Sequence, residues 1–541
     1  MHRASPPPPA GHKGPSRRAL LVGLVLLAAL ARVPGLDAPL LDGAAGKQAH
    51  TAMVARNLLR GRGSFLLPVV DDVGRPGYFV KEAPLVPAAS ALIHDLTGVP
   101  LAACGRALSA LLWLAGAPVL AGLLNGAGLA ALVPVATGFY LFSPLALAYS
   151  VSFQNDAAAV LASLVALGLA GAWARRPAPG AAAAAGLAAG LALLLKPHVV
   201  LWLGPALILL GWPSDGPTEG GPSRRQSLGL AAFLGLATLP ALAWYAHAFQ
   251  IHARFPVAGA MVAAGWVEPG LWLRPELYLE LARQTFWMVL TPAGALLCGF
   301  GMVGARRPGD WREPAALPSS SDLAEARRHG AGGDGRVLGA FLVWSAGVLG
   351  QSFLFATRAF DELARGTEYY QLALVPGLAP FVALGWLHLR TVLAPHRVVV
   401  RGLVAGLVLV AFAGATVAAT IAARTPQARY ARLTELCAEV RKRLPAHLEL
   451  LVLADRAGTV LYECDRRGTA LVPAGAVHQS FATRAHAVPA ASMNRLLGSV
   501  DAVLLPFPEL LPPGDPLRDH LDVNWRHENL GASSGLLFRA R

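Results

Sequence analysis

Residues 398–423 read VVVRGLVAGLVLVAFAGATVAATIAA, a run of 26 residues in which Arg401 is the only charged side chain. A helix needs about 20 predominantly apolar residues to cross a membrane, so this stretch predicts a transmembrane span. Ten further stretches have the same apolar character, which makes about eleven predicted spans and an all-α polytopic membrane protein. The other predicted spans are 19–33, 101–124, 127–148, 157–174, 179–195, 198–212, 228–250, 284–304, 337–357 and 368–389.

The composition of the whole chain supports this class. Of its 541 residues, 55% are hydrophobic and 14% are charged, whereas about 25% are charged in an average soluble protein. The mean hydropathy is +0.49. These values exclude an ordinary soluble protein and a disordered one. The formal net charge of +14 does not indicate a nucleic-acid partner, because a positive excess in a polytopic protein reflects basic loops kept in the cytoplasm.

The first span follows a basic, proline-rich segment, residues 1–18, which we interpret as a cytoplasmic tail. A signal peptide is the alternative, but Arg32, Pro34 and Leu36 stand where its cleavage site would fall. The predicted inner loops are rich in arginine, in agreement with the positive-inside rule. An inside start and an odd number of spans then place residues 36–100 and 425–541 outside. We therefore divide the chain into the tail 1–18, a membrane domain 19–424 and an outer domain 425–541.

The outer domain 425–541 has the pattern of a small α/β domain. Residues 431–443 predict a helix, and residues 448–453, 459–462 and 500–505 predict short strands. Cys437 and Cys464 both fall in this domain, in an oxidising compartment, and we predict that they pair. Two separate buried thiols are the alternative. The sequence Asp465-Arg466-Arg467 is typical of a turn or surface feature.

The first outer loop, residues 36–100, is the most informative stretch for function. Long loops without a fold of their own tend to be functional. Residues 49–59 and 84–96 have helical periodicity but are too short or too polar to span, which fits helices lying at the membrane interface. Acidic and basic side chains gather in this loop: Asp42, Lys47, His50, Arg56, Asp71, Asp72, Lys81 and Glu82.

The run KQAHTAMVARNL at residues 47–58 resembles the first-loop motif of bacterial membrane glycosyltransferases with the GT-C fold. These belong to the superfamily of dolichyl-phosphate-mannose–protein mannosyltransferases and aminoarabinose transferases. The motif reads roughly R-Q-A-D-T-A-x-I-A-R-N. Weaker matches follow in the expected order along the chain: residues 68–72 and 77–85, Gly105-Arg106, Gln154-Asn155-Asp156, Leu195-Lys196-Pro197, Tyr369-Tyr370-Gln371 and residues 462–468.

The resemblance implies a GT-C-like helical domain and transfer, with inversion, of a sugar from a polyprenyl-phosphate carrier. Where the family motif has an acidic residue, this chain has His50. Histidine can act as a base near neutral pH, but it supplies no permanent negative charge. The candidate catalytic residues are therefore Asp42, His50, Asp72 and Glu82. For the three acids the alternative is a solvated loop residue, and for His50 it is the polar face of a short helix.

The donor needs cations for its phosphate and polar groups for its sugar. The candidate substrate-binding residues are Gln48, Lys81, Asn155, Asp156, Lys196, Arg358, Glu368 and Tyr369. Three of these assignments have specific structural alternatives. Asn155-Asp156 could be the N-cap of a helix, since Asn and Asp are favoured there. Lys196 directly follows an apolar run and could be a snorkelling anchor. Glu368-Tyr369 could simply begin a transmembrane span, where an aromatic residue at the membrane interface is normal.

The expected function is that of an integral glycosyltransferase of the bacterial inner membrane, whose C-terminal domain is periplasmic. Its partners would be a polyprenyl-phosphate-linked sugar donor, membrane lipid and an acceptor that the sequence does not identify. The histidines have no metal-site spacing, so a divalent cation could be held only through the acids. The alternatives are a lipid or glycan flippase and a non-catalytic glycolipid-binding protein. Charges at span ends rather than in mid-span favour the enzyme over the flippase.

Overall fold

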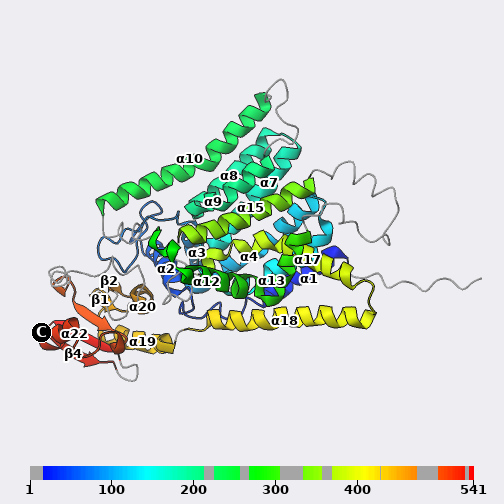
Figure 1. The fold of residues 1–541 in the computed structure, drawn as a ribbon. Helices are drawn as coiled ribbons and strands as arrows, with labels where there is room; N and C mark the ends of the chain where they lie inside the picture. Colours follow the sequence, from blue (N-terminus) through cyan, green and yellow to red (C-terminus); the bar gives the residue numbers. More distant parts are fainter. Residues whose placement is uncertain are drawn as a thin grey trace, which may run out of the picture.

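The computed structural model describes residues 16–211, 224–255, 267, 269–304, 333–355, 368–426, 428–471, 497–530 and 535–540. Within these residues the chain forms a bundle of apolar helices with a small α/β domain beyond one end (Figure 1). Helices α10 and α18 lie at opposite edges of the bundle in this view. The bundle helices are α1 (Arg17–Leu30), α4 (Leu101–Gly126), α5 (Val133–Phe142), α6 (Pro144–Tyr149), α7 (Asp156–Arg175), α8 (Pro179–Leu195), α9 (Val200–Gly211), α10 (Arg224–Arg254), α12 (Pro275–Gln284), α13 (Thr291–Gly304), α15 (Gly333–Leu354), α17 (Leu374–Leu393) and α18 (Val398–Arg424).

The helices confirm a polytopic membrane protein. In the described part of the chain, six are long and apolar enough to cross a membrane: Leu101–Gly126, Asp156–Arg175, Arg225–Arg254, Pro275–Val303, Gly335–Leu354 and Val398–Arg424. The other predicted spans coincide with shorter or less apolar helices, so the number eleven stays a prediction. Short helical turns join some of them: η1 (Ala130–Leu132), η2 (Pro197–Val199), η3 (Pro269–Leu273), η4 (Thr285–Leu290) and η5 (Glu368–Gln371).

The prediction of one unbroken span over 127–148 is wrong. Helix α5 ends at Phe142, and α6 begins at Pro144. Pro144 has no backbone N–H with which to continue the ladder, and the Ser143 side chain instead caps α6 by accepting from the N–H of Ala146 at 3.3 Å.

Helix α1 is tied into the bundle through Arg32, which lies just after it and is 1% exposed. Its guanidinium donates to Ser150 Oγ at 2.8 Å and to the carbonyl of Leu141 at 2.9 Å. These bonds give the buried guanidinium N–H groups hydrogen-bond acceptors and join the N-terminal helix to the α5–α6 break. The segment 19–33 therefore packs as one of the bundle helices.

Glycines allow the closest helix contacts in the bundle. Helices α13 and α17 approach so nearly that a methyl group at Gly385 would overlap the Leu297 carbonyl, and one at Gly301 would overlap the Phe381 carbonyl. In the Ala/Gly-rich α8, Gly186 and Gly190 face the backbone of α10 in the same way. Small residues at such crossings are the usual means by which membrane helices pack, because lipid supplies no hydrophobic drive between them.

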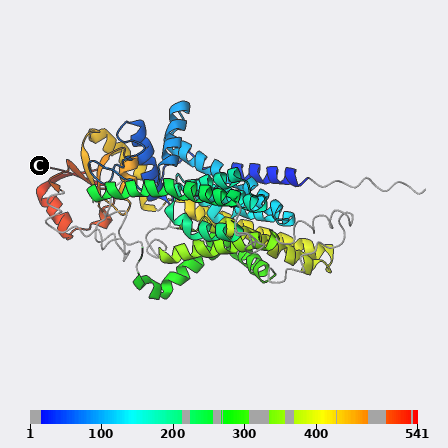
Figure 2. The same cartoon turned by 90° about the horizontal axis from the view of Figure 1, so that it is seen from above.

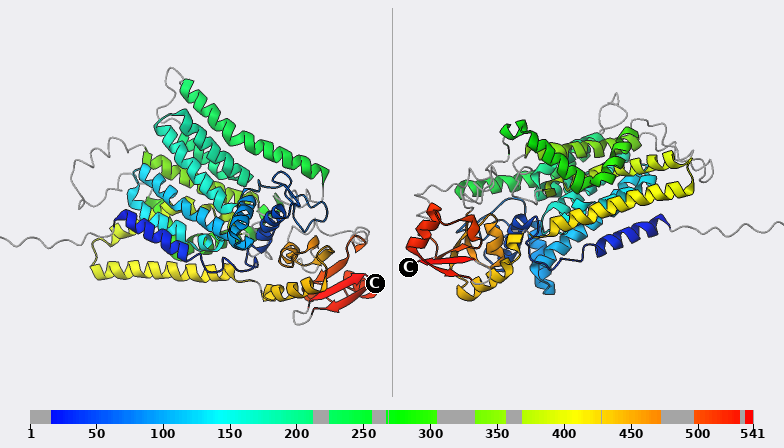
Figure 3. Two further views of the ribbon diagram at one scale, coloured as in Figure 1. Left: turned by 180° about the vertical axis from the view of Figure 1, so that it is seen from behind. Right: turned by 60° about the horizontal axis from the view of Figure 1, so that its bottom comes forward.

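The first loop and the tail domain occupy the same end of the bundle, which we call the loop end. The loop holds α2 (Ala45–Leu59) and α3 (Leu85–Thr97), close to the predicted helices 49–59 and 84–96. Helix α18 also ends here, since the N–H of Gly43 donates to the carbonyl of Ala423 at 3.1 Å. Figures 2 and 3 show the tail domain beside the dark-blue α2 segment in every view.

The tail domain contains η6 (Ala428–Tyr430), α19 (Leu433–Arg443), α20 (Ala457–Glu463), η9 (Pro508–Leu510), α22 (Pro516–Asn524) and strands β1 (Glu449–Leu453), β2 (Arg467–Leu471), β3 (Ala502–Leu505), β4 (Trp525–Asn529) and β5 (Leu536–Ala540). Its described strands form one sheet in the order β2-β1-β3-β5-β4, in which β2, β1 and β3 run parallel and the last two pairings are antiparallel. The small α/β domain is confirmed.

One strand prediction in this domain is wrong. Residues 459–462 lie in the helix α20 instead of a strand. Thr459 and Val460 are β-branched and favour a strand locally, but the segment connects β1 to β2, which are parallel. Parallel neighbours need a crossover, which is usually helical. The strands predicted over 448–453 and 500–505 and the helix over 431–443 are confirmed.

The first loop also completes the tail domain. Strand β2 is an edge of the sheet, and residues Asp71 to Gly74 lie along it. The N–H of Gly468 donates to the carbonyl of Asp71 at 2.8 Å, the N–H of Ala470 to that of Asp72 at 2.9 Å, and the N–H of Gly74 to that of Gly468 at 3.0 Å. The acidic pair Asp71-Asp72 is thus fixed by backbone bonds to a strand some 400 residues later in the chain.

Candidate functional site

Helix α2 is the centre of the candidate site. Its alanines at 45, 49, 52 and 55 are almost completely buried, and small side chains let the helix sit between the bundle and α20. Its polar side chains leave the helix in different directions. Lys47 and His50 are one turn apart and therefore neighbours on the helix surface, whereas Gln48 lies on another face.

Lys47 and Glu82 form a largely buried ion pair. Lys47 Nζ and Glu82 Oε1 are 2.8 Å apart, and the two side chains are 17% and 12% exposed. The segment that carries Glu82 is held by backbone bonds, because Trp244 donates to the Lys81 carbonyl at 3.0 Å and the N–H of Ala83 to the Leu194 carbonyl at 3.0 Å. Helices α8 and α10 thereby fix the position of the carboxylate.

The electrostatics of this pair are set by neighbouring lysines. Burial by itself raises the pKa of Glu82, but the positive charges of Lys47, Lys81 and Lys196 outweigh it and hold that pKa well below its usual range. Burial lowers the pKa of Lys47, but Glu82 outweighs burial and the pKa lies above its ordinary 10.5. Both groups are therefore charged at neutral pH.

Lys196 and Asp156 form a second buried pair beside the first. Lys196 ends α8 and Asp156 begins α7, and the ammonium donates to the carboxylate. The Lys196 Nζ also lies 5.2 Å from the ring centre of Tyr369 and 5.3 Å from that of Tyr370, within the range of a cation–π interaction. We call the four residues of the two pairs, together with Lys81, whose charge also lowers the pKa of Glu82, the lysine–carboxylate cluster: Lys47, Lys81, Glu82, Asp156 and Lys196.

Polar atoms without partners line the start of α7. Among the described residues, no hydrogen-bond partner is present for Asn155 Oδ1, Asp156 Oδ2 or either side-chain polar atom of Gln154, although all are buried. His198 Nδ1, next to Lys196, is in the same condition. Asn155 does not act as a helix cap, because its side chain makes no cap hydrogen bond. Buried polar groups are normally paired, so these atoms are available to a ligand.

His50 and Asp72 form a separate pair. His50 Nε2 lies 2.6 Å from Asp72 Oδ2, and the side chains are 24% and 2% exposed. The His50 ring packs at a tilt on Phe79, with ring centres 5.2 Å apart. Within the described residues, His50 Nδ1 has no hydrogen-bond partner. With Nε2 on the carboxylate, Nδ1 is the nitrogen able to accept a proton.

Asp42 and Gln48 join a third group, with Arg106 of α4. Asp42 Oδ1 accepts from Gln48 Nε2 at 2.5 Å, and its Oδ2 accepts from Arg106 at 3.0 Å. Gln48 Oε1 in turn accepts from the N–H of Phe153 at 2.9 Å. Burial raises the pKa of Asp42, and Arg106 only partly offsets this. Both carboxylate oxygens are occupied, so these contacts connect the loop to α4 and leave Asp42 no oxygen without a partner.

Glu368 and Arg358 complete the predicted set. Glu368 Oε2 accepts from the Tyr149 hydroxyl at 2.8 Å, which joins η5 to the end of α6. Arg358 lies outside the described residues. No group of three His, Cys, Asp or Glu side chains suited to a metal ion is present in the described part of the chain.

The structure thus brings the predicted residues that it describes to one end of the bundle but divides them into groups. Glu82, Lys81, Lys196 and Asp156 share the lysine–carboxylate cluster. His50 and Asp72 pair one helical turn away, and Asp42 with Gln48 faces Arg106. Sequence reasoning missed Lys47 as an ion-pair partner, although it stands at the basic first position of the quoted motif. It also missed His198, for which the sequence holds no signal.

The fold is shared with known structures. ArnT from Cupriavidus metallidurans bound to undecaprenyl phosphate matches 97% of this chain and 98% of its own, with a TM-score of 0.55 and 14% identity. ArnT from the same organism in the apo state matches 96% and 97%, with a TM-score of 0.57 and 14% identity. No family model and no curated protein sequence matches the chain. The GT-C fold implied by the first-loop motif is confirmed.

Proposed function

We propose that this chain is a membrane glycosyltransferase that moves a sugar from a polyprenyl-phosphate carrier to an acceptor at the outer membrane surface. The observation that carries the proposal is the lysine–carboxylate cluster at the loop end of a GT-C fold. Burying charged pairs costs desolvation free energy that their attraction seldom repays, so such a cluster is a candidate functional site. ArnT, which has the same fold, binds undecaprenyl phosphate.

The cluster supplies what a phosphate-linked sugar needs. Lys47, Lys81 and Lys196 are cations that would hold the donor phosphate through charge-assisted hydrogen bonds. The unpartnered atoms of Gln154, Asn155 and Asp156 would bind sugar hydroxyls, since each ligand bond would satisfy a buried group. The polyprenyl chain would lie against the apolar bundle helices, several of whose side chains are exposed along α10.

The His50–Asp72 pair would provide the base. In this proposal the acceptor hydroxyl loses its proton to His50 Nδ1, and its oxygen attacks the anomeric carbon of the sugar. The bond from that carbon to the phosphate oxygen breaks, and its electron pair leaves with the polyprenyl phosphate. Attack opposite the leaving group inverts the anomeric centre. Asp72 would stabilise the imidazolium, and Glu82 would orient Lys47 toward the phosphate.

The proposed setting is the bacterial inner membrane, with the N-terminal tail 1–18 in the cytoplasm and residues 425–541 in the periplasm. The disulfide between Cys437 and Cys464 supports an oxidising compartment for the tail domain, because disulfides persist mainly outside the cytosol. The loop end of the bundle, with the site, would then face the periplasm.

The test is a comparison of cell-envelope glycans and glycolipids between the wild-type strain and a strain that lacks this protein. The deletion strain is complemented with the wild-type chain, with Glu82→Gln or with His50→Ala, and with Asp522→Asn as control. Asp522 pairs with Arg518 on the tail domain and touches none of the site residues above. We expect one glycosylated species to disappear on deletion and to return with the wild type and the control only. An unchanged profile on deletion, or full rescue by both site variants, would contradict the proposal.

A further inference from the structure

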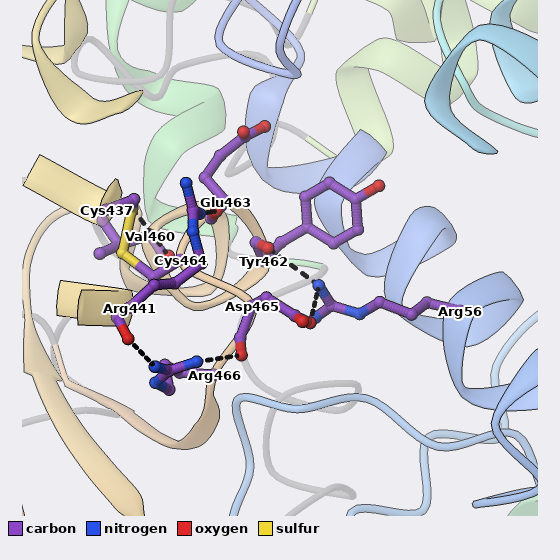
Figure 4. Close-up of a disulfide and its surroundings, with 9 residues drawn as sticks. All are labelled: Arg56, Cys437, Arg441, Val460, Tyr462, Glu463, Cys464, Asp465 and Arg466. Atoms are coloured by element: carbon purple, nitrogen blue, oxygen red, sulfur yellow. Dashed lines mark hydrogen bonds and ion pairs between the residues drawn. A yellow bond between two sulfur atoms is a disulfide. The ribbon is translucent and has the colours of Figure 1, made fainter. Parts of the chain in front are cut away.

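The tail domain contacts α2 through Asp465. This residue begins the sequence Asp465-Arg466-Arg467, which is typical of a surface turn. Asp465 receives two bonds from Arg60, at 2.8 and 2.9 Å, and lies 2.9 Å from Arg56. Both arginines belong to α2, the helix that carries Lys47 and His50. Figure 4 shows Arg56 reaching from α2 to Asp465 beside the Cys437–Cys464 disulfide.

Asp465 is fixed on both sides along the chain. Cys464, its preceding neighbour, is bonded to Cys437 of α19, with Cα atoms 4.3 Å apart. Arg466, its following neighbour, donates to the carbonyl of Leu444 at 2.6 Å and to that of Arg441 at 3.3 Å. The residue itself has φ of 52°, a left-handed conformation that Asp and Asn adopt more readily than most. The carboxylate is therefore held at a defined point relative to α19.

Arg56 connects Asp465 to the acidic residues of the first loop. The guanidinium that meets Asp465 also donates to Asp71 Oδ2 at 2.8 Å and to the Tyr462 carbonyl at 2.9 Å, and it lies over the Tyr462 ring. Asp71 is 1% exposed and directly precedes Asp72. A displacement of Arg56 therefore acts on the segment that holds Asp72 against His50.

The tail domain also closes over the pair itself. Gly458, the second residue of α20, lies against the two side chains. A methyl group there would overlap Asp72 Oδ2 and come within 3.4 Å of His50 Nε2. The overlapped atom is the end of a side chain, so a substitution would displace the carboxylate without breaking the backbone.

We propose that Asp465 is a positioning residue of the site: it holds Arg56 on Asp71, and so keeps the Asp72 carboxylate on His50. The tail domain then helps to position the residues of the site. This inference rests on the proposed function for its catalytic meaning, whereas the arrangement of His50 and Asp72 can be tested without any substrate.

The test uses the full-length chain in lipid nanodiscs. His50 is labelled with diethyl pyrocarbonate at about pH 7, where imidazole is reactive, and its modification rate is followed by mass spectrometry. Asp465→Asn removes the charge but tolerates the left-handed backbone. We expect it to raise the labelling rate of His50 several-fold, and Gly458→Ala to do the same. Glu449→Gln is the matched control, because Glu449 pairs with Arg75 of the same loop but not with α2.

Action through Arg56 is tested by a double variant. If Asp465 works through Arg56, Arg56→Gln combined with Asp465→Asn labels His50 no faster than the more reactive single variant. Transfer activity in Asp465→Asn should fall roughly 10- to 100-fold through loss of orientation, while binding of undecaprenyl phosphate, used as a probe, stays at the wild-type affinity. A purely structural role would weaken that binding as well.

Wild-type labelling of His50 in both Asp465→Asn and Gly458→Ala would overturn the inference, and so would additive effects in the double variant. Should Asp465→Asn fail to fold, Arg56→Gln, which removes the other side of the contact, takes its place, and wild-type labelling of His50 in that variant overturns the inference. If the wild-type chain transfers no sugar while the labelling results hold, the proposed function fails and the positioning of His50 by Asp465 stands.

Discussion

The Lys47 ammonium and the Glu82 carboxylate meet at 2.8 Å although the two residues are 35 positions apart in the first loop. The loop returns on itself, and the backbone bonds of Lys81 and Ala83 to α10 and α8 hold the carboxylate at the end of the bundle. A loop that is polar along its sequence is therefore tied to the bundle by specific backbone and side-chain bonds. Variants of the Lys47–Glu82 ion pair can show whether the pair contributes to folding stability, to sugar transfer or to both.

Removal of one member of this pair should destabilise the protein more than removal of both. Glu82→Ala leaves the Lys47 charge buried without its partner, which should cost about 3–5 kcal/mol of unfolding free energy. The double variant Lys47→Met with Glu82→Leu fills the space with apolar side chains and should recover most of that loss, yet remain inactive. Thermal unfolding in detergent and the glycan profile measure the two effects. Equal stability of the single and double variants would contradict a buried, mutually compensating pair.

The same pair predicts how stability depends on pH. The folded-state pKa of Glu82 is lowered, so its contribution is present above the ordinary 4.5 and is lost as the pH falls below that value. The folded-state pKa of Lys47 is raised, so its contribution is present below 10.5 and is lost as the pH rises through the folded value. The unfolding temperature should therefore fall at both ends of this window by more in the wild type than in the double variant. Parallel curves for the two proteins would contradict the expectation.

Loss of the disulfide should weaken the tail domain locally. Cys437 and Cys464 are 27 residues apart, and a bridge closing a loop of this size stabilises by about 3 kcal/mol. Reductant, or Cys437→Ser with Cys464→Ser, should speed hydrogen exchange in α19 and α20 while α7 and α8 stay unchanged. Reductant should have no further effect on the double serine variant, which serves as the control. Acceleration of exchange in the bundle helices would instead point to global unfolding.

The glycine contact between α13 and α17 should be intolerant of a side chain. Gly385→Ala places a methyl group on the Leu297 carbonyl, a backbone atom that cannot move aside, and should cost about 1–3 kcal/mol. Gly406→Ala on α18 is the matched control, because no atom of the described residues lies within 4 Å of a methyl group there. Thermal unfolding of the two variants measures the difference. Equal unfolding temperatures would mean that the helices can separate without loss.

The sequence predicts local and periodic features of this fold well. In the described residues each apolar run contains helix, although the run 127–148 is divided between α5 and α6, and most tail elements fall where expected. Apolar periodicity depends on residues that are close together in the chain, which is why these features are predictable. The two errors have a common origin. The break at Ser143-Pro144 and the helix at 457–463 depend on where the chain must go next, and local propensity does not contain that information.

The candidate site shows the same division. The first-loop motif singles out Gln48 and His50, and the weaker match at residues 77–85 singles out Glu82, but the partners of these residues come from distant segments. Glu82 pairs with Lys47, which stands in the motif without a role assigned to it, and Gln48 contacts Phe153. Asp465 meets α2 only because β2 places its preceding turn beside that helix. Such long-range pairings follow from tertiary packing rather than from spacing along the chain.

The strand-like segment Asp71 to Gly74 has a practical consequence for the tail domain. It occupies the β2 edge of the sheet, whereas the opposite edge, β4, carries the charged and polar residues Arg526, His527 and Glu528. Natural sheets protect open edges with charge, and β4 has that protection. A fragment that begins after α18 would bare the β2 edge and offer its unpaired N–H and C=O groups to other chains. The tail domain expressed alone should therefore self-associate, and fusing residues 65–80 back to it should restore a monomer.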